Sequence, residues 1–487
     1  MSLMVLGTAS HVGKTLTVAA ICRTLYRMGL PVAPFKSQNM SLNSTVTADG
    51  SEISMAQAVQ ARAAGLAPES DMNPILLKPK GDKVSQVILH GRPYRDLPIT
   101  EYYRETDYLL EEAVAAYRRL ESRYGHVVVE GAGGAAELNL YDRDIANIRL
   151  ARALRLPIVL VADIERGGVF AQVYGTVALL PEDIQGLVVG IIINKFRGDP
   201  AIFTTGVREI ERITGVPVLG IVPFASFPIP SEDSLSIADK KGSGTGIRIG
   251  VIRLPRISNF SDFESLETVA TVEYVPLGVS LDGYDCIILP GTKNTVEDLC
   301  RLQESGTAAE IRAVAARGVP VIGICGGYQM LGRMIIDSGV ESAAGEYPGV
   351  GLLDVVTRFG EYGKTTERRR RRACPIPPIL STVGEVEGYE IHMGSSERGS
   401  DREAFEGDGA VSADGLVFGT YLHGLFENPG AVAALMAFLA DRKGIRSVAP
   451  PDNREKSDPF DDLADLFASH VDMDFIVSFF TDHDDTD

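Results

Sequence analysis

Residues Val321 to Gly332 read V-I-G-I-C-G-G-Y-Q-M-L-G. This apolar run ends at a pair of glycines and continues into a helix-like segment, so it predicts a strand, a tight turn and a helix, with Cys325 at the turn. The backbone N–H groups and the positive dipole end of that helix would activate the thiol and stabilise an oxyanion beside it. We therefore predict that Cys325 is a nucleophile. A buried core cysteine is the alternative, and the two glycines argue against it.

A cysteine nucleophile needs a base, and His423 in the downstream segment G-T-Y-L-H-G-L-F is the candidate. Together, the G-x-C-G-G-x-Q turn and this histidine resemble the glutamine amidotransferase domains of class I. The resemblance implies that the backbone amides of Gly291, in L-P-G-T, and Gly326 form an oxyanion hole. Many such domains carry a glutamate two residues after the histidine, where this chain has Leu425, and Glu427 is not at the matching spacing. The third member of the triad is therefore left open.

The N-terminus carries the pattern of a phosphate-binding loop. A short apolar run is followed by G-T-A-S-H-V-G-K-T at Gly7 to Thr15 and then by a helix-like segment. Backbone amides of the loop, with Thr8 and Gly13, would surround the phosphates of ATP, while Lys14 contacts the β- and γ-phosphates and Thr15 binds Mg²⁺. Five residues separate the two glycines, and this spacing resembles the variant loop of the dethiobiotin synthetase family. ATP and Mg²⁺ are the predicted cofactors.

Further polar residues stand at the ends of apolar, strand-like runs. Glu130 ends H-V-V-V-E and is predicted to bind Mg²⁺. Asp49 is another candidate for the metal, with Glu52 as its rival, although either could instead cap the next helix. Asn194, in G-I-I-I-N-K, is predicted to read the adenine. Because such runs alternate with amphipathic stretches, we expect two doubly wound α/β domains, a P-loop NTPase-like domain and a class I glutamine amidotransferase-like domain.

The domain boundaries follow from changes in composition. We expect an ATP-dependent domain over residues 1–228, a linker rich in Gly and Ser over 229–246, an amidotransferase domain over 247–448 and an acidic extension over 449–487. Apolar residues recur at helical spacing between 460 and 476, which predicts a docked helix in that extension. The last residues, 481–487, are expected to fray.

Four segments have sequences that a purely structural role would not require. They are P-F-K-S-Q-N-M-S-L-N-S at 34–44, N-P-I-L-L-K-P at 73–79, the run E-G-A-G-G-A-A-E-L-N-L-Y-D-R-D-I-A-N-I-R at 130–149 and D-I-E-R-G-G-V-F at 163–170. They resemble the glutamine-hydrolysing cobyric acid synthase family over nearly the whole chain. The resemblance implies ATP- and glutamine-dependent amidation of the b, d, e and g carboxylates of adenosylcobyrinic acid a,c-diamide in cobalamin biosynthesis. The reaction would use a carboxyl phosphate and ammonia released at the Cys-His site.

The same segments supply the predicted contacts to the corrinoid. Asp142 and Asp144 would face the substrate, although a carboxylate pair bonded to loop backbone is the other reading. We also expect a local basic patch, because a corrin with several carboxylates would otherwise be repelled by an acidic protein. That patch would contain Lys36, Lys78, Lys80 and Lys83. The full set of predicted substrate residues is Lys36, Gln38, Asn39, Lys78, Asp142 and Asp144.

Charge and composition exclude several classes of function. The net charge of -18, from 47 basic and 65 acidic residues, opposes binding to nucleic acid or to an anionic membrane. The five arginines of residues 368–372 are therefore expected to form a solvated loop rather than a nucleic-acid patch. Five cysteines without C-x-x-C spacing suggest neither a zinc site nor a disulfide framework. With no apolar stretch of membrane-spanning length, we expect a cytoplasmic enzyme with small-molecule substrates, and a homo-oligomer is left open.

Two alternative functions remain at this point. A partitioning-type ATPase with a non-catalytic C-terminal module would carry a signature lysine in its phosphate loop, at the position where this chain has Ala9. The related cobyrinic acid a,c-diamide synthase would have the same two sites and would amidate different carboxylates. Only the loops over residues 36–44 and 73–91 could discriminate the second alternative.

Overall fold

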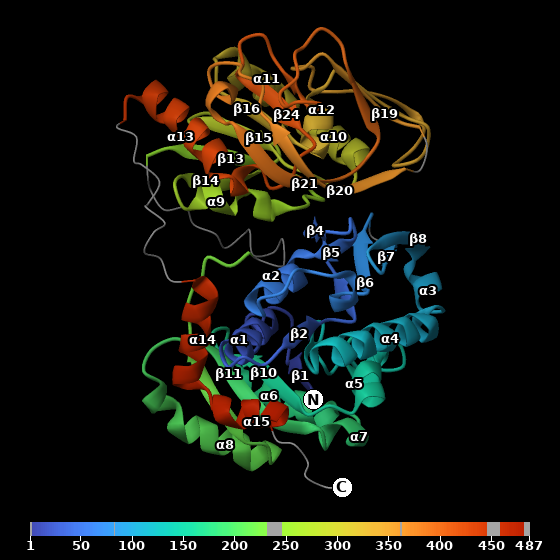
Figure 1. Ribbon diagram of the computed structural model, residues 1–487, viewed down its shortest axis with the longest axis vertical. Coiled ribbons are helices and arrows are strands. Elements are labelled where there is room, and N and C mark those ends of the chain that lie inside the picture. Colours follow the sequence, from blue (N-terminus) through green and yellow to red (C-terminus); the bar gives the residue numbers. More distant parts are fainter. Residues whose placement is uncertain (1, 82, 231–245, 361–362, 446–457, 482–487) are drawn as a thin grey trace.

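Alternating apolar strands and amphipathic helices build two α/β domains, stacked along the long axis of the molecule (Figure 1). The computed structural model describes residues 2–81, 83–230, 246–360, 363–445 and 458–481. The predicted fold class, with two doubly wound α/β domains, is confirmed. Most of the expected linker lies outside the described residues.

The N-terminal domain is organised by a six-stranded parallel sheet of order β12-β11-β10-β1-β9-β2. Its strands are β1 Ser2–Gly7, β2 Val32–Phe35, β9 His126–Glu130, β10 Ile158–Asp163, β11 Val188–Phe196 and β12 Val218–Pro223. Successive side chains of β1 face opposite sides, so Met4 and Leu6 enter one apolar core and Leu3 and Val5 enter the other. Burial on both faces is the reason that these strands are apolar throughout rather than alternating.

Helices cover both faces of this sheet (Figure 1). They are α1 Lys14–Arg27, α2 Met55–Ala63, α3 Ile99–Tyr102, α4 Thr106–Tyr124, α5 Ile148–Leu154, α6 Val169–Leu179, α7 Glu182–Gln185 and α8 Thr204–Thr214. Two small sheets lie toward the other domain. One has the order β3-β6-β7-β8, and the other pairs β4 with β5. Their strands are β3 Gln38–Met40, β4 Ser44–Val46, β5 Glu52–Ser54, β6 Ile75–Pro79, β7 Val84–Leu89 and β8 Arg92–Pro98.

The C-terminal domain repeats the plan with a sheet of order β14-β13-β15-β16-β24-β23, in which only the β23–β24 pairing is antiparallel. Its strands are β13 Arg248–Arg253, β14 Thr271–Pro276, β15 Cys286–Leu289, β16 Val321–Ile324, β23 Ala410–Val411 and β24 Val417–Thr420. The helices are α9 Glu264–Glu267, α10 Thr295–Glu304, α11 Thr307–Ala316, α12 Gly326–Leu331 and α13 Pro429–Lys443. A four-stranded sheet, β18-β17-β19-β22, is added beside them. It contains β17 Met334–Asp337, β18 Gly345–Pro348, β19 Val355–Phe359 and β22 Ser395–Arg398.

The arginine run forms a strand, so the expectation of a solvated loop is wrong. Strand β20, Lys364–Arg372, pairs antiparallel with β21, Glu385–Met393. Glutamates on β21 neutralise the run, since Arg372 pairs with Glu385 at 2.7 Å and Arg370 pairs with Glu387. Cross-strand pairs of opposite charge stabilise such a ladder. The run is therefore half of a charge-paired hairpin, which the arginines alone could not reveal.

The chain returns to the N-terminal domain at its end. Helices α14, Pro459–His470, and α15, Met473–Thr481, lie against the lower domain, whereas α13 lies with the upper one (Figure 1). Arg23 of α1 contacts Asp458 at 2.7 Å and Asp461 at 2.8 Å. Only glycine fits at position 220, because a Cβ there would lie 2.1 Å from the carbonyl oxygen of His470. Of residues 481–487, which are expected to fray, Thr481 is the last residue of α15 and 482–487 lie outside the described residues.

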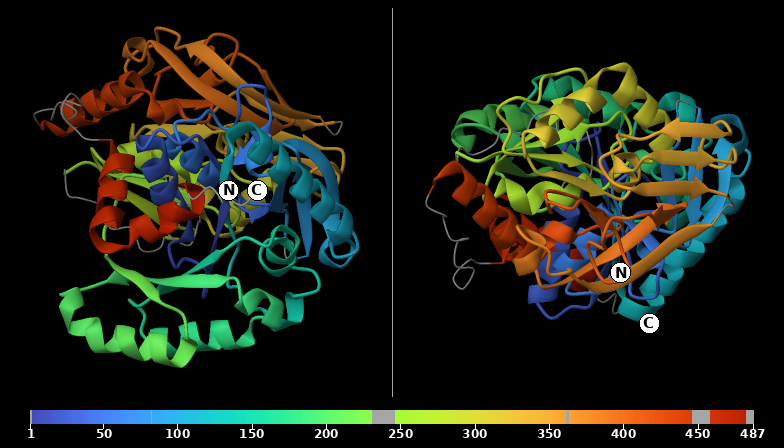
Figure 2. Two further views of the ribbon diagram at one scale, coloured as in Figure 1. Left: turned by 60° about the horizontal axis from the view of Figure 1, so that its bottom comes forward. Right: turned by 90° about the horizontal axis from the view of Figure 1, so that it is seen from above.

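Direct contacts join the two domains. Asn259 donates to the carbonyl of Ser44 at 2.9 Å, and Arg368 donates to the carbonyl of Val46 at 2.9 Å. Val46 also packs with Tyr389 and Ile391 of β21 in a small apolar cluster. The two views of Figure 2 show the hairpin and the small N-terminal sheets meeting at this boundary.

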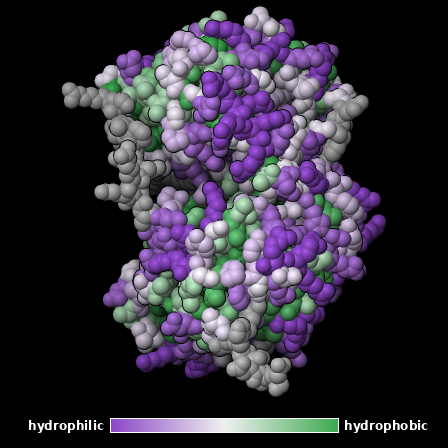
Figure 3. All heavy atoms as spheres, in the orientation of Figure 1, coloured by the Kyte–Doolittle hydropathy of each residue, from purple (hydrophilic) through white to green (hydrophobic). Residues whose placement is uncertain are grey.

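The viewed surface is mainly hydrophilic, with hydrophobic residues in scattered patches (Figure 3). Among the described residues, no helix combines the length and the apolar character needed to cross a bilayer.

Candidate active site

Cys325 sits between strand β16 and helix α12 with φ 52° and ψ −109°, a backbone conformation that residues with a side chain rarely adopt. The following glycines permit close packing: a Cβ at Gly327 would lie 2.0 Å from the carbonyl oxygen of Leu289. Cys325 as a residue is 6% exposed, and its sulfur lies 3.5 Å from the carbonyl oxygen of Ile391. The strand, turn and helix place this sulfur beneath hairpin strand β21.

His423 follows β24 and is held by a carboxylate that comes from another part of the chain. Its Nδ1 lies 2.7 Å from Asp262, and Asp262 also accepts a hydrogen bond from the backbone N–H of Gly424 at 2.9 Å. Both side chains are 2% exposed. The ring of Tyr389 stacks on the imidazole with centroids 5.4 Å apart. These contacts direct the other ring nitrogen toward Cys325.

The charge state of His423 follows from these neighbours. Burial alone would lower its pKa, but the charges of Asp262 and Cys325 and their hydrogen bonds to the imidazole outweigh it and raise the pKa of His423 to about 10. At neutral pH the site therefore favours an imidazolium beside Cys325. The protonated imidazole is an acid placed to protonate a leaving amine.

Asp262 is the carboxylate partner of His423 that sequence reasoning missed. It lies in a short 3-10 turn, Phe260–Phe263, beyond the end of β13. It is separated from the histidine by 161 positions, so no local spacing could identify it. The usable signal was its place in a loop after a parallel strand, where side chains meet at one sheet edge.

Replacing Asp262 by asparagine should lower glutamine hydrolysis by about 10²- to 10⁴-fold, because the imidazolium loses its charged partner while the acceptor for Gly424 is kept. The sign of the pH effect follows from the raised pKa. Without the carboxylate, His423 releases its proton at lower pH, so the alkaline limb of the kcat profile should move down from near pH 10. The matched control is Glu427→Gln, which should leave both the rate and the profile unchanged. An unaltered alkaline limb in the Asp262 variant would contradict the triad.

The two glycines predicted to form the oxyanion hole, Gly291 and Gly326, lie close to other residues of the site. A Cβ at Gly291 would lie 3.0 Å from the imidazole of His423, and a Cβ at Gly326 would lie 2.8 Å from the methyl group of Thr292. Gly291 therefore permits a close approach to His423, and Gly326 permits a close approach to Thr292. Their role as amide donors stays a prediction.

A small cavity of about 50 Å³ opens beside the thiol, and Glu341 is the one carboxylate among its lining residues. Glu341 accepts hydrogen bonds from the backbone N–H groups of Thr295 and Val296 at 3.0 and 3.2 Å, at the start of α10. Burial raises its pKa to about 7 despite these bonds. Gln329, another lining residue, accepts a hydrogen bond from Thr295 at 3.0 Å and donates to Tyr421 at 3.1 Å.

The second predicted site surrounds the phosphate loop between β1 and α1. Thr15 donates to Glu130 at 3.0 Å, and the ammonium of Lys36 contacts the same carboxylate at 3.0 Å. Lys14 donates to the carbonyls of Ala9 and Gly133 at 3.0 and 2.7 Å. The structure thus brings together Lys14, Thr15, Glu130 and Lys36, although the sequence placed Lys36 in a substrate loop.

Asn194 supports the loop from behind. It donates to the carbonyl of Val12 at 2.8 Å, and a Cβ at Gly13 would lie 2.0 Å from its amide nitrogen. The hydroxyl of Thr8 lies 3.5 Å from the side-chain oxygen of Gln172. Adenine recognition by Asn194 stays a prediction, since its observed contacts position the loop.

The two alternative metal carboxylates lie elsewhere. Asp49 accepts hydrogen bonds from Thr47 and Ser51 within its own turn, which hold its pKa below the ordinary value. Glu52 is buried between Lys78 and Lys364 at the domain boundary. These contacts do not bring either carboxylate to Thr15. Among the described residues, no group of three or more His, Cys, Asp or Glu side chains is arranged as a metal site.

The expected lysine patch does not form, which corrects that interpretation. Lys36 pairs with Glu130, Lys78 with Glu52 and Lys80 with Asp96, so their charges are used at separate places within the protein. Of the four lysines, Lys83 is the one exposed side chain. A patch of free ammonium groups was inferred from spacing along the chain, which carries no information on internal partners.

The remaining predicted substrate residues also have internal partners. Tyr102 donates to Gln38, and buried Asn39 donates to Ser54 at 2.8 Å. Asp144 accepts hydrogen bonds from the backbone N–H groups of Ala146 and Asn147, as expected for a carboxylate that stabilises its own loop. Asp142 is exposed. A cavity of about 240 Å³ nearby is lined by Thr100, Tyr103, Arg104 and Arg143. No ion pair within the described residues engages its two arginines.

Comparisons with known proteins match both domains. Residues 3–234 match the CobQ/CobB/MinD/ParA nucleotide binding domain, and residues 248–431 match the CobB/CobQ-like glutamine amidotransferase domain. A probable cobyric acid synthase of Methanoculleus marisnigri is 68% identical over 99% of each chain. Another from Methanoregula boonei is 66% identical over 98% of this chain and 99% of its own. Among solved structures, PurLQS from Thermotoga maritima is 20% identical with a TM-score of 0.31, covering 40% of this chain and 99% of its own.

Proposed function

This chain belongs to the cobyric acid synthase family, and from that premise we propose that its two sites act in series as a carbon–nitrogen ligase. One domain releases ammonia from glutamine, and the other uses ATP to activate a corrinoid carboxylate that the ammonia then amidates. The observation that carries the proposal is the pairing, on one polypeptide, of a Cys325–His423–Asp262 centre with a phosphate loop whose Thr15 contacts Glu130.

In the glutaminase half, the thiolate of Cys325 attacks the side-chain amide carbon of glutamine, and the oxyanion accepts bonds from the amides of Gly291 and Gly326. His423 gives its proton to the departing nitrogen, so ammonia leaves and a thioester remains. Water then hydrolyses the thioester, which releases glutamate and restores the free thiol. We assign the glutamine ammonium group to Glu341, because that carboxylate is held facing the cavity beside the thiol.

In the synthetase half, the γ-phosphoryl group of ATP is transferred to a corrinoid carboxylate, and ammonia displaces phosphate from the acyl phosphate to form the amide. Lys14 exchanges its two loop carbonyls for phosphate oxygens. A hydroxyl and a carboxylate are the hard oxygen ligands that Mg²⁺ prefers, so Thr15 and Glu130 would hold the ion, which supplies charge neutralisation on the phosphates. Lys36 balances Glu130 at this edge.

Family membership favours this function over the two alternatives. The relatives match over nearly full length, which a partitioning-type ATPase with an unrelated C-terminal module would not. They carry the name of cobyric acid synthase and not that of the a,c-diamide synthase. The proposed substrate is therefore adenosylcobyrinic acid a,c-diamide, amidated at the b, d, e and g carboxylates.

The direct test is to incubate the purified protein with ATP, Mg²⁺, glutamine and either adenosylcobyrinic acid a,c-diamide or cobyrinic acid, and to identify the products by mass spectrometry. We expect successive gains of one, two, three and four amide groups on the a,c-diamide, with glutamate released in proportion. Amidation of cobyrinic acid confined to its a and c positions would instead assign the protein to the alternative enzyme.

A further inference from the structure

The cavity beside Cys325 is shared between the domains. Besides Cys325 and His423, its lining includes Lys293 and Lys364 of the C-terminal domain and Lys78 of the N-terminal domain. The space of about 50 Å³ therefore joins the reacting thiol to the domain boundary, from which Lys78 approaches on β6. A product formed at the thiol is therefore released into a space that the N-terminal domain also lines.

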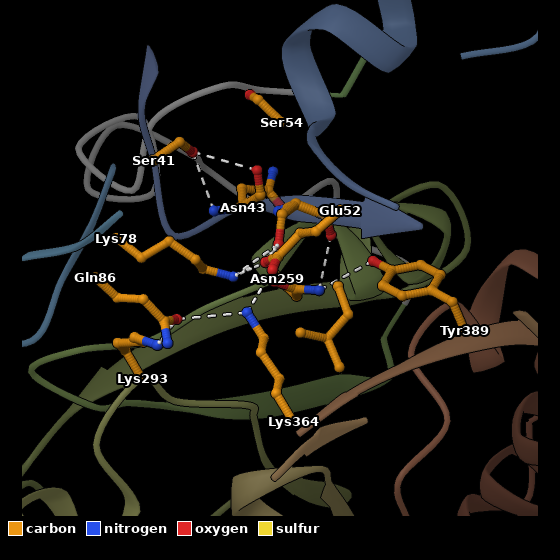
Figure 4. A network of polar contacts seen from close by, with 12 residues as sticks. Ser41, Asn43, Glu52, Ser54, Lys78, Gln86, Asn259, Lys293, Lys364 and Tyr389 are labelled. Atoms are coloured by element: carbon orange, nitrogen blue, oxygen red, sulfur yellow. Dashed lines mark hydrogen bonds and ion pairs between the residues drawn. The ribbon is translucent and has the colours of Figure 1, made fainter. Parts of the chain in front are cut away.

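Three of these lining residues, Lys78, Lys293 and Lys364, belong to a buried cluster of charged and amide groups (Figure 4). Glu52 is held between Lys78 and Lys364, and the ammonium of Lys293 donates to Gln86 at 2.7 Å. Lys78 and Lys364 have side chains that are only 4% and 5% exposed. We call Glu52, Lys78, Gln86, Lys293 and Lys364 the boundary cluster.

The charge of the boundary cluster favours one form of the product. Lys78 and Lys364 outnumber its one carboxylate, Glu52, so a further cation there would be repelled while neutral ammonia would not. Burial and the neighbouring lysines also hold the pKa of Lys293 well below its usual range. The lining therefore suits passage of unprotonated ammonia, the form that can attack an acyl phosphate.

Buried polar side chains continue from the boundary cluster to the phosphate loop. Ser44 contacts Lys78 at 2.8 Å and is paired with Ser54 in the β4–β5 ladder. Asn39 contacts Ser54 and Gln57, at 2.8 and 3.1 Å. Gln57 then contacts Gln60, which donates to Glu130. Each member of this chain is 3% exposed or less, except Lys78 at 4%. The polar chain thus leads from the boundary cluster to the proposed site of carboxylate activation.

We propose that ammonia released at Cys325 enters the N-terminal domain through the boundary cluster, between Lys78, Glu52 and Lys364. The inference rests on the proposed function, since it presumes that the two sites act in series. Ammonia moves as the neutral molecule, and no bond is made or broken until it displaces phosphate. The cluster positions and seals this passage and takes no part in either chemical step.

The test measures coupling rather than rate alone. In Lys78→Met the stem volume is retained and Glu52 stays neutralised by Lys364, so no buried charge is left unpaired. We expect glutaminase activity and ammonia-dependent amidation to stay near wild type. The ratio of amide formed to glutamate released should fall by roughly fivefold or more, because ammonia escapes into solvent. Lys293→Met, which alters the cavity from the C-terminal side, should show the same pattern.

Two matched controls separate a passage from a simple domain contact. Arg368→Ala removes an interdomain hydrogen bond outside the cavity, and Lys80→Met removes an ion pair next to β6. Both should keep the wild-type ratio. The inference is overturned if the ratio is unchanged in the Lys78 and Lys293 variants, or if Arg368→Ala lowers it equally. A wild-type protein that forms no amide from either nitrogen source would instead refute the proposed function.

Discussion

The Cys325→Ser variant is expected to lose glutamine-dependent amidation by roughly 10⁴-fold or more, while amidation from added ammonia stays largely intact. The structure gives the physical reason. His423, with its pKa raised to about 10, is already protonated at neutral pH and cannot remove a proton from a serine hydroxyl. The synthetase site lies in the other domain and does not use the thiol. The measurement is corrinoid amide formed with glutamine and, separately, with ammonium chloride.

A suitable control is Cys374→Ser, which changes a half-buried thiol away from the site. It should retain both activities. Glutaminase activity near wild type in the Cys325 variant would remove this residue from the mechanism. Loss of ammonia-dependent amidation as well would indicate that the substitution had disturbed the N-terminal domain, and thermal unfolding of both variants would identify that outcome.

The Lys14→Ala variant is expected to lose amidation with either nitrogen source by about 10²- to 10³-fold, because both routes need an activated carboxylate. In the structure Lys14 is 6% exposed and spans two loop carbonyls, so the ammonium is held where phosphate oxygens would arrive. Ammonia cannot replace that charge. The measurements are ATP-dependent formation of amide and of ADP at saturating ammonia.

Glutaminase activity distinguishes a local from a global effect of this substitution. It should persist in Lys14→Ala, because Cys325, His423 and Asp262 all belong to the other domain. The exposed Lys83→Ala variant serves as a control and should keep both activities. Full ammonia-dependent turnover by the Lys14 variant would contradict the assignment of ATP chemistry to the N-terminal half.

Local patterns in the sequence sufficed to predict the fold class and the central residues of both proposed sites. The strand, glycine-rich turn and helix at Cys325, and the similar sequence at Lys14 and Thr15, are formed by consecutive residues. Backbone geometry at such turns depends on near neighbours and on the absence of a Cβ, so the local sequence suffices to predict it. Glu130 could also be predicted from the sequence, because it ends an apolar strand of a parallel sheet.

Only the tertiary structure decided which charged groups are partners. Asp262 reaches His423 across 161 positions, and Lys78 and Lys364 meet on Glu52 from different domains. A lysine paired with a buried carboxylate and a lysine exposed to solvent look the same in a sequence, because burial and Coulomb energy depend on distance in space. The sequence by itself therefore predicted the two chemistries, whereas packing within the C-terminal domain brought Asp262 to His423 and packing between the domains buried Lys78, Glu52 and Lys364 at their boundary.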